Sequence, residues 1–248
     1  MVRRFRTSVV FPALLALSAC DSEPPAAATE CVVFLHGLAR TAQSMDKIEA
    51  AFAEQDYLTA NIDYPSREFP IEVLAPEAVG RGLSDCRAGG ATRIHFVTHS
   101  LGGILVRYYL DGNVIEELGR VVMLAPPNQG SEVVDDYRNA PGYDQLNGPA
   151  GSQLGTGEDS IPAKLGPVEF PLGVIAGTRS INLILSQSLP NPDDGKVSVS
   201  STQVEGMTDF LVVDVSHPFI MRSDEVIEQT QHFLRHGAFD HQRAETQD

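Results

Sequence analysis

Hydrophobic residues recur along this chain in two alternating patterns, short continuous runs and longer stretches with helical spacing. The continuous runs occupy residues 31–36, 58–64, 93–99, 120–125, 172–176 and 210–215. Runs of this kind are typical of strands that are buried on both faces of a parallel sheet. The stretches with an apolar helical face occupy residues 42–52, 71–83, 101–111 and 225–236. The alternation predicts an α/β fold, a doubly wound and mostly parallel sheet of about six strands with helices on both faces.

Residues 132–167 interrupt this alternation. They have little strand character, and Gly, Pro, Asn and Asp are frequent among them. A stretch of this length without regular periodicity is often a lid or a binding segment. The sequence leaves two interpretations open: a substrate-facing cap, with short helices such as one over 131–138, or a structural excursion over the surface.

The start of the chain is typical of a targeting segment. Three Arg lie within the first six residues, and the apolar run 9–17 is too short to span a bilayer comfortably. The Leu-Ser-Ala-Cys that follows, ending at Cys20, resembles the lipobox of bacterial lipoproteins. This resemblance implies that residues 1–19 are a removed signal peptide and that Cys20 carries a lipid. The alternative is an ordinary secretory signal that is cut after Ala19.

Residues 20–30, which include a Pro pair and an Ala run, are interpreted as a tether. About ten such residues have a root-mean-square reach of roughly 15–20 Å, which would keep the domain close to its membrane. Roughly 220 residues then remain, a length that suits one α/β domain at 31–248. The lipoprotein interpretation predicts an exported protein anchored on the periplasmic side of the cell envelope. The alternative signal predicts a soluble periplasmic or secreted domain.

Composition narrows the classes of partner. The chain has 33 Asp and Glu against 18 Lys and Arg, a formal net charge of −15. Such a surface argues against nucleic acid and against electrostatic attraction to anionic lipid, so membrane contact would depend on the anchor. Beyond the leader, Cys31 and Cys86 match no zinc-binding pattern. In an oxidising compartment they could form a disulfide, and two separate thiols are the alternative.

Candidate chemistry centres on the segment Val-Thr-His-Ser-Leu-Gly-Gly, residues 97–103, where an apolar strand turns into a helix. A serine at such a corner has a strained backbone, and the helix that begins there directs free N–H groups toward it. The segment resembles the nucleophile elbow of α/β-hydrolase lipases and esterases, with Thr98 where the family's usual motif has glycine. The resemblance implies that Ser100 is a nucleophile and that residues 31–248 form an α/β-hydrolase catalytic domain.

Two further segments resemble loops of the same family. His36-Gly37, at the end of the first strand, resembles the oxyanion loop, which implies that the backbone N–H groups of Leu38 and Leu101 bind the oxyanion. His36 is expected to brace this loop, in preference to acting as the base. The Pro-Asn-Gln-Gly-Ser segment at 127–131 resembles a loop beside the elbow. The residues expected to line the site are therefore His36, Gly37, His99 and Asn128.

The acid and the base follow later in the chain. Asp-Asp-Gly-Lys-Val at 193–197 resembles the acid loop of the family and matches it at Asp194, with Asp193 as the fallback. His217 follows the last strand, at the edge where catalytic loops gather. The order Ser100, Asp194, His217 is that of α/β-hydrolases, in which the carboxylate orients the imidazole. Asp214 lies too near His217 along one strand to orient it and is interpreted as structural.

The resemblance as a whole implies a serine hydrolase that cleaves carboxylic esters through an acyl-enzyme, without a metal or an organic cofactor. Small-molecule or lipid esters with apolar acyl groups are the expected substrates. Apart from the membrane that would hold the anchor, no nucleic-acid or protein partner is implied. Two alternatives stay open: acyl transfer by the same three residues, and a non-catalytic envelope lipoprotein that binds a lipid or a partner.

Overall fold

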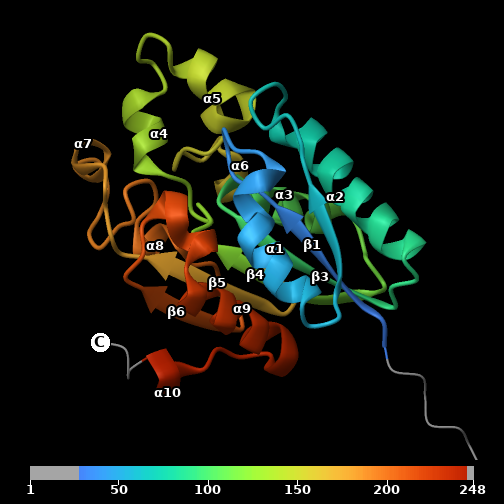
Figure 1. The fold of residues 1–248 in the computed structure, drawn as a ribbon. Coiled ribbons are helices and arrows are strands. Elements are labelled where there is room, and N and C mark those ends of the chain that lie inside the picture. Colours follow the sequence, from blue (N-terminus) through green and yellow to red (C-terminus); the bar gives the residue numbers. More distant parts are fainter. Residues whose placement is uncertain (1–27, 245–248) are drawn as a thin grey trace, which may run out of the picture.

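The computed structural model describes residues 28–244. Within that range six parallel strands form one sheet in the order β2-β1-β3-β4-β5-β6 (Figure 1). The strands are β1 (Glu30–Leu35), β2 (Leu58–Ile62), β3 (Arg93–His99), β4 (Leu118–Leu124), β5 (Leu172–Gly177) and β6 (Asp209–Val213). The strand order reverses direction once, between β1 and β3, as in a doubly wound fold. The architecture predicted from the hydrophobic pattern is confirmed.

Helices cover both faces of the sheet (Figure 1). They are α1 (Asp46–Ala53), α2 (Ile71–Ala88), α3 (Leu101–Gly112) and α9 (Asp224–His236). Because side chains alternate across a strand, β1 contributes to a core on each face. Val33 packs in the core that contains the buried residues of α2 and α3, whereas Val32 and Phe34 pack with those of α1 and α9. Both faces are therefore apolar, as the continuous hydrophobic runs require.

Short helices gather beyond the carboxyl edge of the sheet. The segment that lacked periodicity contains α4 (Glu132–Tyr137), α5 (Tyr143–Ser152) and α6 (Ile161–Lys164). Helices α4 and α5 lie at the top of Figure 1, above the sheet edge. The other short helices are η1 (Ala42–Met45), α7 (Leu183–Ser186), α8 (Val199–Thr202), η2 (His217–Arg222) and α10 (His241–Ala244). We call residues 132–165 the cap.

One long helix extends beyond its predicted end and anchors a covalent link. Helix α2, expected over 71–83, continues to Ala88 because Leu83 and Cys86 extend its buried face. Cys86 is joined by a disulfide to Cys31 of β1. The bridge thus ties the first strand to the helix that precedes the elbow strand. The sequence left open a disulfide or two separate thiols, and the structure has the disulfide.

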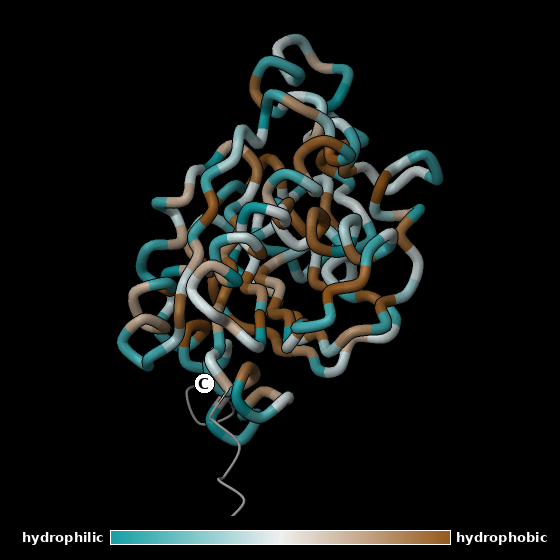
Figure 2. The backbone as a smooth tube through the Cα atoms, turned by 90° about the vertical axis from the view of Figure 1, so that its right-hand side faces the viewer, coloured by the Kyte–Doolittle hydropathy of each residue, from teal (hydrophilic) through white to brown (hydrophobic). Residues whose placement is uncertain are grey.

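The interior of the described chain is hydrophobic and its periphery is mostly hydrophilic (Figure 2). Within residues 28–244, no helix has both the length and the apolar character needed to cross a bilayer. The predicted signal peptide, residues 1–19, and the predicted lipidation site at Cys20 lie outside the described residues.

Candidate active site

Ser100 lies at the corner between β3 and α3 with a strained backbone. Its φ is 51° and its ψ is −117°, a conformation that residues with a side chain rarely adopt. Two hydrogen bonds hold it there: its N–H donates to the Leu124 carbonyl at 2.9 Å, and its carbonyl accepts from Gly103 N–H at 3.0 Å. Strain of this kind persists only where the surroundings enforce it, and it turns the Ser100 side chain toward the cavity above the sheet edge.

The corner packs tightly against the end of β1. A Cβ atom at Gly102 would lie 2.6 Å from the Leu35 carbonyl oxygen, so only glycine fits at that position. Thr98, which occupies the place of the usual first glycine, is fully buried, and its hydroxyl has no hydrogen-bond partner among the described residues. The β-branched side chain is therefore accommodated, at the cost of an unsatisfied buried hydroxyl.

Asp194 and His217 form a buried, hydrogen-bonded pair. His217 Nδ1 donates to Asp194 Oδ2 at 2.7 Å, and the His217 backbone N–H donates to the Asp194 carbonyl at 3.1 Å. Asp194 Oδ1 accepts the backbone N–H groups of Lys196 at 3.0 Å and Val197 at 2.8 Å. Because both carboxylate oxygens are engaged, the acid is fixed in position. It holds the proton on His217 Nδ1 and leaves Nε2 free to accept another.

The two other carboxylates considered as partners of His217, Asp193 and Asp214, do not contact its imidazole. Asp193 Oδ1 accepts the Gly195 N–H at 2.7 Å, and its Oδ2 accepts the Ser186 hydroxyl at 2.6 Å. Asp193 therefore closes the acid loop and does not contact His217. Asp214 pairs with Arg179 at the surface. The structure brings Asp194, and neither of these two residues, to the imidazole.

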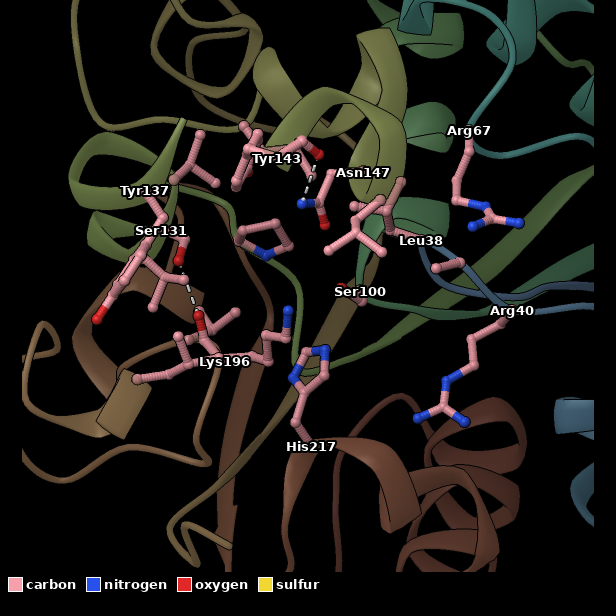
Figure 3. A pocket seen from close by; sticks show the side chains of 18 of the residues that line it. Leu38, Arg40, Arg67, Ser100, Ser131, Tyr137, Tyr143, Asn147, Lys196 and His217 are labelled. Carbon is pink, nitrogen blue, oxygen red and sulfur yellow. Dashed lines mark hydrogen bonds between the residues drawn. The ribbon is translucent and has the colours of Figure 1, made fainter. Parts of the chain in front are cut away.

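His217 and Ser100 line the same cavity (Figure 3). The imidazole rises from η2 below the serine, and no hydrogen bond joins the two side chains in the part of the chain that the structure describes. Catalytic hydrogen bonds are often long before a substrate is bound, so this separation does not oppose a proton transfer between them.

His99 supports the backbone beneath the imidazole. Its Nε2 lies 3.1 Å from the His217 carbonyl and must carry the proton, because a carbonyl only accepts. Burial, reinforced by the positive potential of His217 and Arg40, holds the pKa of His99 well below its usual range. The ring is therefore neutral. Its Nδ1 is a buried acceptor with no partner among the described residues.

The backbone N–H groups of Leu38 and Leu101 are free for an acceptor. Among the described residues neither makes a hydrogen bond, since Leu101 is the first residue of α3 and Leu38 lies in the loop after β1. That loop is close to the elbow: a Cβ atom at Gly37 would lie 3.2 Å from Ser100 Cβ. The Ala39 N–H donates to Ser66 Oγ at 3.1 Å, which helps to fix the loop.

Of the four residues expected to line the cavity, His99 lines it, whereas His36, Gly37 and Asn128 lie behind its wall. The His36 ring stacks on Tyr64, with ring centroids 4.0 Å apart, and accepts the Tyr64 N–H at 3.3 Å, so it braces the loop that follows β1. Burial lowers the pKa of His36. Asn128 accepts from Arg107 and donates to the Thr202 carbonyl at 2.8 Å, contacts that turn its amide away from the cavity.

The cavity has a volume of about 540 Å³ and a largely apolar wall (Figure 3). Its apolar lining comes mainly from the cap, helix α7 and the acid loop: Val133, Val134, Tyr137, Tyr143, Leu146, Leu154, Leu185 and Val197. The charged residues of the lining are Arg40, Arg67 and Lys196. The sequence offered residues 132–167 as a possible cap without identifying which of its side chains line the cavity, and no motif marked Arg67. Within residues 28–244, no group of His, Cys, Asp and Glu is arranged to hold a metal ion.

Comparison with protein-family models and with curated proteins finds no match. Solved structures do match. The mature lipase BlEst2 of Bacillus licheniformis is similar over 86% of this chain and 94% of that one, with a TM-score of 0.66 and 19% identity. The phospholipase PlaB of Legionella pneumophila, in complex with thio-NAD, is similar over 82% of this chain and 56% of that one, with a TM-score of 0.64 and 18% identity.

An extracellular α/β-hydrolase from a Paenibacillus species is similar over 83% of this chain and 98% of that one, with a TM-score of 0.51 and 13% identity. At sequence identities this low, structural similarity is evidence for a shared fold and not for a shared activity. Together with the six-stranded parallel sheet, the likenesses show that the chain has the α/β-hydrolase fold.

Proposed function

We propose that this protein is a serine hydrolase that cleaves carboxylic esters with Ser100, Asp194 and His217. The observation that supports this most strongly is the 2.7 Å hydrogen bond between Asp194 and His217 at the cavity that Ser100 also lines. In this proposal, three separate segments of the chain supply the nucleophile, the base and the orienting acid. That combination is what nucleophilic acyl transfer requires.

The proposed reaction runs through an acyl-enzyme. His217 Nε2 takes the Ser100 proton as Oγ attacks the ester carbonyl, and the free N–H groups of Leu38 and Leu101 bind the resulting oxyanion. His217 then protonates the departing alcohol as the C–O bond breaks. A water molecule, deprotonated by the same imidazole, attacks the acyl-enzyme, and Ser100 recovers its proton as the carboxylic acid leaves.

The wall of the cavity favours esters with an apolar acyl chain. Leu146, Leu154 and Val197 are among the side chains that such a chain would contact. Burying each CH₂ of an acyl chain there would contribute about 0.8 kcal/mol. Two of the similar solved structures are named as a lipase and a phospholipase, which agrees with this substrate class.

Export and anchoring through Cys20 also belong to the proposal. The disulfide between Cys31 and Cys86 supports export, because such bonds persist in oxidising compartments. The proposed tether would join the domain at Glu30, where β1 begins, and Ser100 follows the opposite end of the neighbouring strand β3 (Figure 1). An anchored domain would therefore carry its cavity on the side away from its point of attachment.

Hydrolysis of p-nitrophenyl esters with short to long acyl chains tests the proposal. We expect hydrolysis that falls by about 10⁴-fold or more in Ser100→Ala. Ser152→Ala, a serine of α5 that does not line the cavity, is the matched control and should keep its activity. Absence of hydrolysis by the folded protein, or equal activity of Ser100→Ala, would refute the proposed function.

A further inference from the structure

The charge of the cavity wall is opposite to that of the protein. The chain has 33 Asp and Glu against 18 Lys and Arg. The charged side chains that line the cavity are nevertheless Arg40, Arg67 and Lys196, with no carboxylate among the lining residues. The sign of charge at the cavity wall thus differs from that of the whole chain, and clefts lined by one sign of charge concentrate ligands of the opposite sign.

These three cations have no partner within the protein. Elsewhere, Arg87, Arg93 and Arg179 pair with carboxylates, and the buried Arg107 donates to backbone carbonyls. By contrast, the side chains of Arg40, Arg67 and Lys196 make no hydrogen bond or ion pair with any residue in the described range 28–244. Their donors are available to a ligand that enters the cavity.

Figure 3 shows how the cations lie relative to the nucleophile. Arg40 and Arg67 stand on one side of Ser100, on the loops that follow β1 and β2. The cap residues Tyr137 and Tyr143 stand on the other side, and the side chain of Lys196 reaches from that side toward His217 and Ser100. An ester bond placed at Ser100 would therefore have an apolar wall on one side and two guanidinium groups on the other.

Lys196 adds an electrostatic reason for an anion. Lys196 is an exposed residue, but the groups packed around its amine desolvate it and so lower its pKa. Asp194 opposes this shift, and the charge of Arg40 adds to it. The carboxylate of Asp194 is already engaged by His217 and by two backbone N–H groups. A negatively charged ligand would add a counter-charge that is not already shared with His217.

We propose that Arg40 and Arg67, assisted by Lys196, bind a phosphate group on the alcohol part of the ester substrate, while its acyl chain lies against the cap. The inference rests on the proposed ester hydrolysis. Guanidinium forks bind phosphate, as they bind carboxylate, in a bidentate manner, and the double charge of a phosphate monoester suits more than one cation. The substrate class is thus an acyl ester of a phosphorylated alcohol, as in a glycerophospholipid.

Binding to the Ser100→Ala protein tests this subsite without relying on turnover. The matched ligands are 1-octanoylglycerol 3-phosphate and 1-octanoylglycerol, which differ only in the phosphate, each titrated below its micellar concentration by calorimetry. We expect the phosphorylated ligand to bind at least about tenfold more tightly, with the preference weakening as salt is raised. The Arg40→Gln/Arg67→Gln variant should reduce the preference to about twofold, and Lys196→Gln should reduce it in part.

Arg138→Gln is the matched control. Arg138 is an exposed cation that follows α4, does not line the cavity and has no side-chain partner among the described residues, so this variant should keep the preference. Equal binding of the two ligands, or a preference that survives in the folded double variant and in Lys196→Gln, would overturn the subsite. Inorganic phosphate that binds as tightly as the phosphorylated ester would also overturn it, since the acyl chain would then contribute nothing.

Turnover by the native enzyme separates this inference from the proposed function. If the protein cleaves both esters, the ratio of kcat/KM for the phosphorylated to the neutral ester should fall about tenfold in the double arginine variant. If it cleaves neither ester nor any p-nitrophenyl ester, the proposed function fails, and the calorimetric comparison still decides the anion subsite. Cleavage with a ratio that the arginine substitutions leave unchanged would retain the hydrolase and reject the subsite.

Discussion

The sheet edge that carries Ser100, Asp194 and His217 differs in construction from the cap that covers it. At the sheet edge, polar atoms are held by backbone groups of neighbouring segments: Ser100 by Leu124, and Asp194 by Lys196 and Val197. Each position is thus set by the main chain of the fold. Small changes in a side chain there should have large effects on chemistry, because positioning within a few tenths of an ångström matters for proton transfer.

Side-chain hydrogen bonds help to join the cap to the rest of the domain. Gln153 accepts the Ile71 N–H at 2.8 Å, and Arg107 donates to the carbonyl of Leu165 at 2.9 Å. Its inner side chains, such as Val133 and Leu154, are buried, whereas Leu146 remains 66% exposed although it lines the cavity. The cap therefore shapes the volume available to a substrate, and single substitutions in it should change specificity by modest factors.

Adjacent carboxylates provide the sharpest test of the sheet edge. In Asp194→Asn an amide would face His217 Nδ1, so the imidazole would carry its proton on Nε2 and lose its ability to accept one from Ser100. We expect kcat to fall by about 10⁴-fold. Asp193→Asn keeps an oxygen for the Gly195 N–H and should lower kcat by less than about tenfold. Comparable losses in the two variants would contradict the assignment of Asp194.

The disulfide should contribute strongly to stability and little to chemistry. It closes a loop with a sequence separation of 55 residues. On the chain-entropy model, a loop of that size makes the bridge worth about 4 kcal/mol. The Cys31→Ala/Cys86→Ala variant should lose about that much free energy of unfolding in urea and keep its kcat at 25 °C. A loss of kcat in the folded variant would link the bridge to the site, against this expectation.

Buried histidines should make the sheet sensitive to acid. Burial lowers the pKa of His95 to about 4, despite the opposing charge of Glu30, and the pKa values of His36 and His99 are lowered in the same direction. The folded state favours the neutral rings, so their contribution is complete above about pH 6.5 and is lost as the pH falls toward 4. His95 alone should account for about 3 kcal/mol over this range.

Urea unfolding at pH 7.5, 5.5 and 4 measures this dependence. The His95→Gln variant keeps an acceptor for the Arg120 N–H, now 2.9 Å from His95 Nδ1, and should show a shallower decline in unfolding free energy. The difference between the two slopes isolates His95, because His36 and His99 are common to both proteins. Identical slopes would show that His95 is not held neutral in the folded protein.

The smallest effect is expected in the cap. Leu146→Asp should lower kcat/KM for long-chain p-nitrophenyl esters by about fivefold, because a charge in the apolar wall disfavours the acyl chain, and should change short-chain hydrolysis less. Val114→Asp is the control, since Val114 is 91% exposed and does not line the cavity. Loss of short-chain activity as well would mean that the cap positions the catalytic residues.

The sheet and the strand-to-helix corner at Ser100 could be predicted from the sequence because they depend on local patterns. The continuous run that forms β3, the turn at Ser100 and the glycine at 102 are adjacent in the chain, and each has a direct physical meaning. The pairing of His217 with Asp194, and not with Asp193, depended on the family resemblance. The structure supplies the hydrogen bonds that distinguish the two carboxylates.

The positions of several cavity residues depend on long-range packing and could not be predicted from the sequence. Asn128 was expected at the cavity, but Arg107, a residue of α3, draws its amide into the interior. Arg67 reaches the cavity from the loop after β2, with no motif to mark it. The wall formed by the cap likewise depends on how α4 and α5 fold over the sheet edge, and no periodicity in residues 132–167 predicts that arrangement.

Labelling with a fluorophosphonate probe tests the central claim, that Ser100 is an activated nucleophile. The probe should attach to one serine, which peptide mass spectrometry should identify as Ser100, and His217→Gln should slow the reaction by about 10³-fold or more. Ser100→Ala should abolish labelling while circular dichroism shows an intact fold. Labelling at a different serine, or no labelling of the folded native protein, would contradict the account.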